Sequence, residues 1–140
     1  DNFKLGTGDI KYITVKNLTT NGTLDFTGCD TIDESARAIV HNRSDIQIGD
    51  ILFASIAPLG RCYLIQSEPT DWDINESVFS IRANTDIVTP SFLYLYFIKH
   101  SSSSVNFPAK ERINPASGIS CMGLSMDLSI LRHRRISFLS

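Results

Sequence analysis

The sequence lacks any apolar run of the roughly 18 to 20 residues that a membrane-spanning helix needs, and no charged-then-apolar leader opens it. It has only three cysteines and three histidines, which are scattered along the chain without a C-x-x-C pair. We therefore expect neither a membrane protein, nor a secreted cystine scaffold, nor a zinc site. An odd number of separated cysteines is typical of reduced, buried thiols, so we expect a cytoplasmic protein without metal or other cofactor.

A strong charge of one sign is also missing. The net charge is −2, which by itself does not favour a nucleic-acid partner, because such domains are usually strongly basic. The distribution is uneven, since residues 1–98 hold 7 basic and 13 acidic side chains whereas residues 99–140 hold 6 and 2. One basic face on an otherwise acidic protein is compatible with this distribution.

The chain has the size and composition of one globular domain. It has 140 residues, of which 42% are hydrophobic and 20% are charged, close to the mean of folded proteins. A chain of this length buries roughly two thirds of its unfolded surface without help from disulfides or metals. We expect a single domain over residues 1–140 and, because the first residue is Asp1, an excised domain or a processed product.

Short apolar or alternating runs, separated by turn residues, predict an all-β or α+β domain. Asn21-Gly22 is a strong turn signal. Trp72 lies between Asp71 and Asp73, which repel phosphate, so we expect a core or protein contact there rather than a platform for a base. We expect strands over residues 10–15, 51–55, 61–66, 77–82 and 135–138, the last one after a helical turn that begins near Leu128.

Two helices are predicted from capping signals. Thr31 with Glu34 three residues later resembles a capping box, which favours a short helix over 31–39. Thr89 and Pro90 are typical of an N-cap and a first helical position. They predict a longer helix over 90–100, with an apolar face.

Several features follow one another in an order that resembles a known family. Lys16-Asn17 ends a strand, Gly49-Asp50-Ile51-Leu52 leads to Ser55, and Leu59-Gly60 forms a turn. An Asn75-led strand, the Pro90 helix rich in Phe and Tyr, Gly118-Ile-Ser and a final Leu-x-x-Leu turn follow. Over residues 5–138 the chain is similar to the target recognition domain of the DNA specificity subunit of type I restriction-modification enzymes.

The resemblance implies a fold and a function. The fold would be α+β, with a twisted, barrel-like β core, short helices and one longer helix near 90–100. The domain would read one half of a split site in double-stranded DNA, without a catalytic role, while methyltransferase and restriction subunits act as its partners. Family members often continue into a proline-rich step and a long helix. The sequence has neither after residue 138, so we expect this chain to be a fragment of a two-domain subunit.

Two loops carry the residues that would contact DNA, since Arg, Lys, Asn and Ser can read base edges or bind phosphates. The other interpretation of the first loop is an ordinary hairpin turn, and of the second a solvated connector. Weaker candidates are Lys16, Asn17, Arg43 and Arg134. The first loop offers Ser55, Pro58, Leu59, Gly60 and Arg61, and the second, within residues 106–120, offers Lys110, Arg112, Asn114, Ser117 and Ser120.

Two other classes of function stay open. A small hydrolase could combine Cys62 or Cys121 with Asp50 and one of the three histidines His41, His100 and His133, although no local signature surrounds either cysteine. A protein-interaction module without DNA binding would suit the acidic residues 1–98. The sequence does not specify the DNA target or the oligomeric state.

Overall fold

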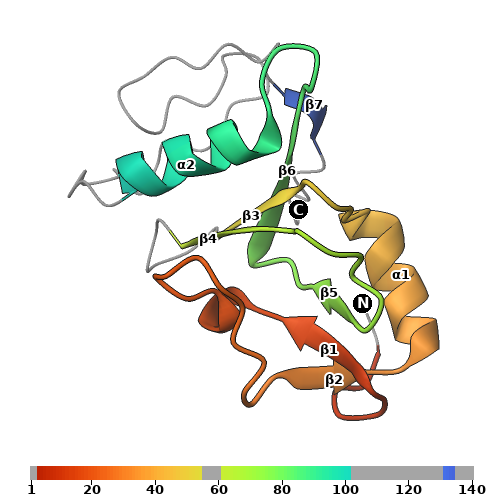
Figure 1. Ribbon diagram of the computed structural model, residues 1–140. Coiled ribbons are helices and arrows are strands. Elements are labelled where there is room, and N and C mark those ends of the chain that lie inside the picture. Colours follow the sequence, from red (N-terminus) through yellow and green to blue (C-terminus); the bar gives the residue numbers. More distant parts are fainter. Residues whose placement is uncertain (1–2, 55–60, 102–130, 135–140) are drawn as a thin grey trace, which may run out of the picture.

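The computed structural model describes residues 3–54, 61–101 and 131–134 (Figure 1). The side chains of His100, Ser101 and residues 131–134 are not among those described. In chain order the elements are β1 (Ile10–Ile13), the 3-10 turn η1 (Val15–Asn17), β2 (Asp30–Ile32), α1 (Glu34–Ser44), β3 (Ile51–Ala54), β4 (Cys62–Leu64), β5 (Trp72–Ile74), β6 (Val78–Ala83), α2 (Pro90–Ser101) and β7 (Leu131–Arg134).

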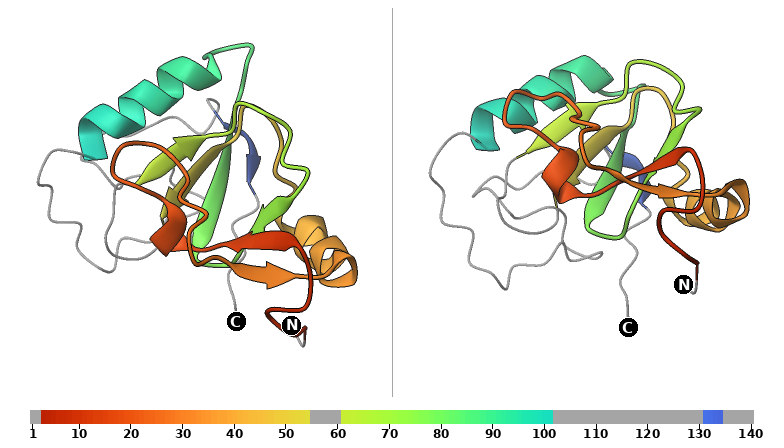
Figure 2. Two further views of the ribbon diagram at one scale, coloured as in Figure 1. Left: turned by 60° about the horizontal axis from the view of Figure 1, so that its bottom comes forward. Right: turned by 90° about the horizontal axis from the view of Figure 1, so that it is seen from below.

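The described strands form two sheets (Figure 2). The smaller sheet has the order β2-β1-β5, with β1 antiparallel to β2 and parallel to β5. The larger sheet has the order β4-β3-β6-β7, and its neighbours are all antiparallel. The predicted α+β class is confirmed, while the strands of the described part make two small sheets rather than one closed barrel.

Three hydrophobic clusters hold these layers together. One lies between the two sheets and joins Ile13 and Trp72 of the smaller sheet to Leu52 of the larger one. In the second, Leu93 and Phe97 of α2 pack on the larger sheet, and in the third, α1 packs on the smaller sheet (Figure 1). Trp72 is only 6% exposed, so the expectation of a core position for this residue is confirmed.

The first helix begins later than its sequence signal suggests. Thr31 lies in β2, opposite Lys11 of β1, so the capping box expected at Thr31 and Glu34 is wrong. Asp33 is the N-cap instead, and its Oδ1 accepts a hydrogen bond from the backbone N–H of Ala36 at 2.8 Å. The helix then runs to Ser44 and ends at Asp45, which adopts the left-handed conformation at φ 46°.

Most of the other predicted elements are present, with ends that differ by one or two residues from the prediction. The strand expected over 10–15 ends at Ile13 because Thr14 caps η1. The helix with Thr89 and Pro90 at its start is confirmed as α2. The sequence patterns do not predict β5, and β7 occupies residues just before the strand expected over 135–138, which lies outside the described residues.

Within the described part of the chain, none of the helices combines the length and apolar character required to cross a bilayer.

Candidate nucleic-acid interface

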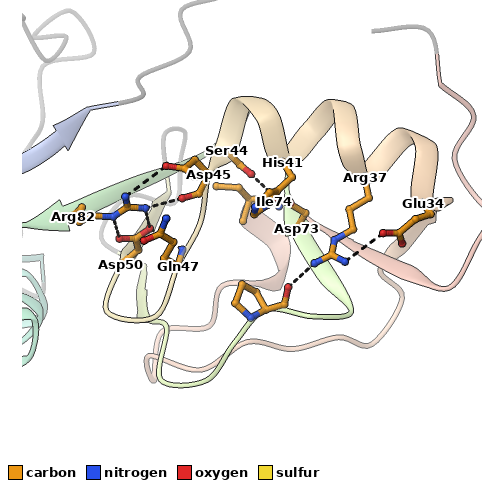
Figure 3. Close-up of polar contacts among 11 residues, drawn as sticks. Glu34, Arg37, His41, Ser44, Asp45, Gln47, Asp50, Asp73, Ile74 and Arg82 are labelled. Atoms are coloured by element: carbon orange, nitrogen blue, oxygen red, sulfur yellow. Dashed lines mark hydrogen bonds and ion pairs between the residues drawn. The ribbon is translucent and has the colours of Figure 1, made fainter.

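The Gly49-Asp50 segment is held in place by a buried ion pair (Figure 3). Asp50 is fully buried, and its two carboxylate oxygens accept hydrogen bonds from Arg82 Nε at 2.7 Å and Nη2 at 2.8 Å. Asp50 also accepts from the Gln47 backbone N–H at 2.9 Å, while Arg82 Nη2 donates to the Asp45 carbonyl at 2.6 Å. The hydrogen bonds to Asp50 raise the pKa of Arg82. This pair therefore fixes the start of β3 against β6 and leaves Arg82 committed to the fold.

A second buried carboxylate docks α1 on β5 (Figure 3). Asp73 accepts from Ser44 Oγ at 2.6 Å and from the Ile74 backbone N–H at 2.8 Å through Oδ1, and Oδ2 lies 2.9 Å from His41 Nδ1. The His41 side chain is 43% exposed, whereas that of Asp73 is fully buried. The arrangement orients the imidazole with one ring nitrogen engaged by the protein.

Each described side chain that was a candidate for a hydrolase site has another structural partner. Asp50 is bonded to Arg82, and His41 is bonded to Asp73. Cys62 packs in the apolar cluster under α2 and is 2% exposed. Burial raises the pKa of the Cys62 thiol to about 11, which keeps it in the unreactive thiol form near neutral pH. Cys121, His100 and His133 are not among the side chains that the structure describes.

Four of the predicted DNA contacts have described side chains: Lys16, Asn17, Arg43 and Arg61. Arg134 lies in β7, paired with Ile81 of β6, and its side chain is not described. The other predicted contacts lie outside the described residues. These are Ser55, Pro58, Leu59, Gly60, Lys110, Arg112, Asn114, Ser117 and Ser120.

Asn17 supports the backbone and is not available to a ligand. It is 6% exposed. Its Oδ1 accepts from the Thr14 backbone N–H at 2.9 Å, and its Nδ2 donates to the Asp25 carbonyl at 2.8 Å. We therefore assign Asn17 to the structure of the connection between η1 and β2 rather than to DNA contact, whereas its neighbour Lys16 is exposed.

Arg43 is half-buried beside an acidic residue. It donates from Nη2 to the Tyr12 hydroxyl at 3.5 Å, and the same atom lies 4.0 Å from Glu76 Oε2. With Ser44, Asn75 and Ser80, Arg43 and Glu76 line a small pocket between α1 and β6. The nearby carboxylate offsets the charge of Arg43, which makes this position less suited to a phosphate than a cation without such a neighbour.

Arg61 has a different environment, directly at the start of β4. Its Nη1 donates to the Leu18 carbonyl at 3.2 Å, while its Nε is buried without a hydrogen-bond partner among the described residues. A buried donor without a partner costs about 1–3 kcal/mol. Within the described part of the chain, the guanidinium is therefore incompletely satisfied and has no carboxylate partner.

The described cationic side chains divide into two groups by their partners. Several form ion pairs, as Lys11 does with Asp71, Arg37 with Glu34, Arg43 with Glu76 and Arg82 with Asp50. Lys4, Lys16, Arg61 and Lys99 form none with the described residues.

Three of these four cations belong to elements that meet at one side of the molecule. Lys16 lies in η1, Arg61 at the start of β4 and Lys99 near the end of α2. Arg61 bonds to Leu18, and the Tyr94 hydroxyl of α2 donates to the Gly22 carbonyl at 3.3 Å, so all three elements converge on the 18–24 segment. Figures 1 and 2 show the same convergence. We call Lys16, Arg61 and Lys99 the cationic corner.

The sequence predicts two of these three residues as contacts. Lys99 is not among the predicted contacts, although it is the first of the basic residues in 99–140. The charge pattern could not place the helix that carries it beside β4, because this depends on how α2 packs on the larger sheet.

Neither the known protein-family models nor the curated proteins include a match to this sequence. The functional proposal therefore depends on the residues and their geometry.

Proposed function

We propose that this chain recognises a specific sequence in double-stranded DNA, as the specificity module of a type I restriction-modification enzyme. It would read one half of a split site in the major groove. It would adopt the target recognition domain fold, act in the cytoplasm and depend on methyltransferase and restriction subunits for the chemistry. The order of features along the sequence supports the family assignment, and the cationic corner supports the DNA-binding role.

The observation that carries the proposal is the environment of Arg61. Among the described residues its guanidinium has no carboxylate partner and an unsatisfied Nε, whereas Arg37, Arg43 and Arg82 are each paired with an acidic side chain. An arginine that loses little by leaving its present contact is suited to bind an external acceptor. Guanine offers the bidentate acceptor pair N7 and O6 in the major groove, and Arg is the side chain that most often reads it.

Lys16 and Lys99 would have a different role from Arg61. Both are exposed and form no ion pair with the described residues, and a lysine ammonium binds phosphate as a compact point charge without reading sequence. Two lysines on the elements that meet at Arg61 would fix the position of the protein on the duplex. The overall net charge of −2 does not by itself oppose this arrangement, because binding depends on the local distribution of charge at the surface that meets the DNA.

The second candidate function is a protein-interaction module that does not bind DNA. It is favoured by α2, which leaves Phe92 at 64% and Leu95 at 62% exposed. Large apolar side chains on one exposed helix often mark contact with another protein. The two functions differ in their response to DNA, so one binding experiment separates them.

The test is selection of a randomised duplex library on the purified chain at low salt, followed by sequencing of the retained DNA. Enrichment of a short motif is the expected result and would establish a sequence reader. Retention without enrichment would indicate binding to the phosphate backbone only. The absence of retention by a chain that circular dichroism shows to be folded would favour the protein-interaction module.

A further inference from the structure

The turn between η1 and β2 presents a side chain that is not among the contacts predicted from the sequence. Asn21 is exposed at the tip of the 18–24 segment, and its amide group makes no hydrogen bond to the described residues. An Asn amide offers a donor and an acceptor on one plane, which match N6 and N7 of adenine in the major groove. Asn17, four residues earlier, has the same chemistry but uses it inside the protein.

The turn that carries Asn21 is held by its own hydrogen bonds. The Thr19 backbone N–H donates to the Thr23 carbonyl at 3.0 Å, and the hydroxyls of Thr19 and Thr23 lie 2.8 Å apart. The Gly22 N–H donates to the Thr19 carbonyl at 3.4 Å, and Gly22 adopts φ 74°. This matches the hairpin turn in which a left-handed glycine follows the two central residues. None of these hydrogen bonds involves the side chain of Asn21.

The same turn is closed by a bridge at its base and anchored to the rest of the protein by Leu18 and Gly22. Leu18 and Leu24 form an antiparallel bridge, and Leu18 is fully buried. Tyr94 of α2 donates to the Gly22 carbonyl, and this bond stays in place when Arg61 leaves the Leu18 carbonyl to read a base. Asn21 therefore stands on a rigid support, in the segment on which the elements of the cationic corner converge. A fixed amide loses less entropy on binding than a mobile one, which favours a specific contact.

We propose that Asn21 is a specificity-determining residue that contacts one base pair of the DNA target, with adenine as the base it matches best. The assignment rests on the proposed function, since it requires that the cationic corner faces DNA. Phosphate contacts from Lys16 and Lys99 would bring the turn to the groove, and the neutral amide of Asn21 would read a base edge there. Arg61 and Asn21 would then read different base pairs of the same half-site.

The test compares the wild-type chain with Asn21→Ala on the selected duplex and on duplexes that carry each alternative base pair at every position of the motif. The expected result is loss of discrimination at one A·T pair, by about 5- to 100-fold, with other positions unchanged. Because Asn21 is uncharged, the salt dependence of binding should also stay the same. Asn42→Ala is the matched control, because it removes an exposed amide from α1, away from the cationic corner.

The possible outcomes separate this assignment from the proposed function. Equal weakening of all duplexes by Asn21→Ala, or no change on any of them, would overturn the role of Asn21 while leaving a DNA reader in place. Failure of the folded wild-type chain to retain any duplex would overturn the proposed function and this assignment together. If Asn21→Ala does not fold, Asn21→Ser provides the same comparison, because serine is common in turns.

Discussion

The Tyr94 hydroxyl donates to the Gly22 carbonyl at 3.3 Å, and it occupies the space in which a Cβ at position 22 would lie. Gly22 is required here for two separate reasons. Its φ of 74° is unfavourable for residues with a side chain, and the close approach of Tyr94 leaves no room for one. The contact joins α2, which carries Lys99, to the turn between η1 and β2.

Gly22→Ala should therefore reduce the free energy of unfolding by about 2–3 kcal/mol, from left-handed strain of about 1–2 kcal/mol and loss of the Tyr94 hydrogen bond of about 1 kcal/mol. Gly28→Ala is the matched control, because Gly28 has φ 67° and a Cβ at that position would meet no described atom within 4 Å. Urea denaturation should show a smaller loss for the control, of about 1–2 kcal/mol. Equal losses would mean that the Tyr94 contact contributes nothing. Tyr94→Phe should also lower the additional cost of Gly22→Ala, since it removes the overlapping atom.

Asp50→Asn should destabilise the protein by about 3 kcal/mol, because it removes the buried carboxylate that pairs with Arg82 and leaves Arg82, among the described residues, only the longer ion pair with Asp45, at 3.5 Å. The Asp50 side chain is 1% exposed and that of Arg82 is 25% exposed. Glu34→Gln is the comparison, since its ion pair with Arg37 lies on the helix surface with Glu34 78% exposed. Breaking such an exposed pair should cost less than about 0.5 kcal/mol. Chemical denaturation of both variants measures the difference, and similar small losses would show that the buried pair does not stabilise the start of β3.

Cys62 should react slowly with iodoacetamide at pH 8 in the folded protein and quickly after denaturation. Burial raises the pKa of its thiol to about 11, from the ordinary value of 9.0, so the reactive thiolate is scarce. Mass spectrometry of peptides after timed labelling distinguishes Cys62 from the other two cysteines. Rapid labelling of native Cys62 would contradict its buried, protonated state and would favour the hydrolase interpretation.

The same raised pKa predicts a pH dependence of stability. A group whose pKa is higher in the folded state binds its proton more tightly there, so its contribution to stability is complete below pH 9 and is lost as the pH rises from about 9 towards 11. Cys62→Ala should cost stability at pH 7 by leaving a small cavity, but it should show a shallower loss between pH 9 and 11. Parallel slopes for the two proteins would contradict the effect of burial on this thiol.

Short sequence patterns correctly predict the elements that depend only on residues close together in the chain. Thr89 and Pro90 define the start of α2. Of its apolar residues, Leu93 and Phe97 pack on the larger sheet, whereas Phe92 is 64% exposed and lies off that face. The pattern at Thr31 fails because Asp33, two residues later, is an equally good cap, and only the pairing of Thr31 with Lys11 decides between them. β5 has three residues and depends on parallel pairing with β1, which no short pattern reveals.

The site is less predictable than the fold because it depends on which charges are paired. The sequence does not show which arginine has an acidic partner. Arg43 lies beside Glu76, and Arg61 has no acidic neighbour in contact among the described residues. The partners of both arginines are distant along the chain and meet them only through tertiary packing. For the same reason, the sequence predicts a contact at Asn17, which is buried, and none at the exposed Asn21.

The cationic corner can be tested by removing its charges one at a time. Arg61→Ala should reduce the preference for the selected sequence more than the overall affinity, because the guanidinium would read a base. Lys16→Ala should weaken all duplexes similarly and lower the slope of log K against log salt by about one unit, as expected for a phosphate contact. Lys110→Ala, at a position outside the described residues, should behave as Lys16→Ala does.

Lys4→Ala is the matched control for these variants. Lys4 is exposed and, like Lys16, forms no ion pair with the described residues, but it lies before β1, where its carbonyl accepts from Thr7, rather than at the cationic corner. Its removal changes the net charge equally, so it should leave the salt slope intact if position matters more than total charge. If Lys4→Ala and Lys16→Ala weaken binding equally, general attraction by net charge would explain the affinity. If Arg61→Ala weakens every duplex by the same factor, Arg61 is a phosphate contact and sequence preference must come from other residues, of which Asn21 is the first to test.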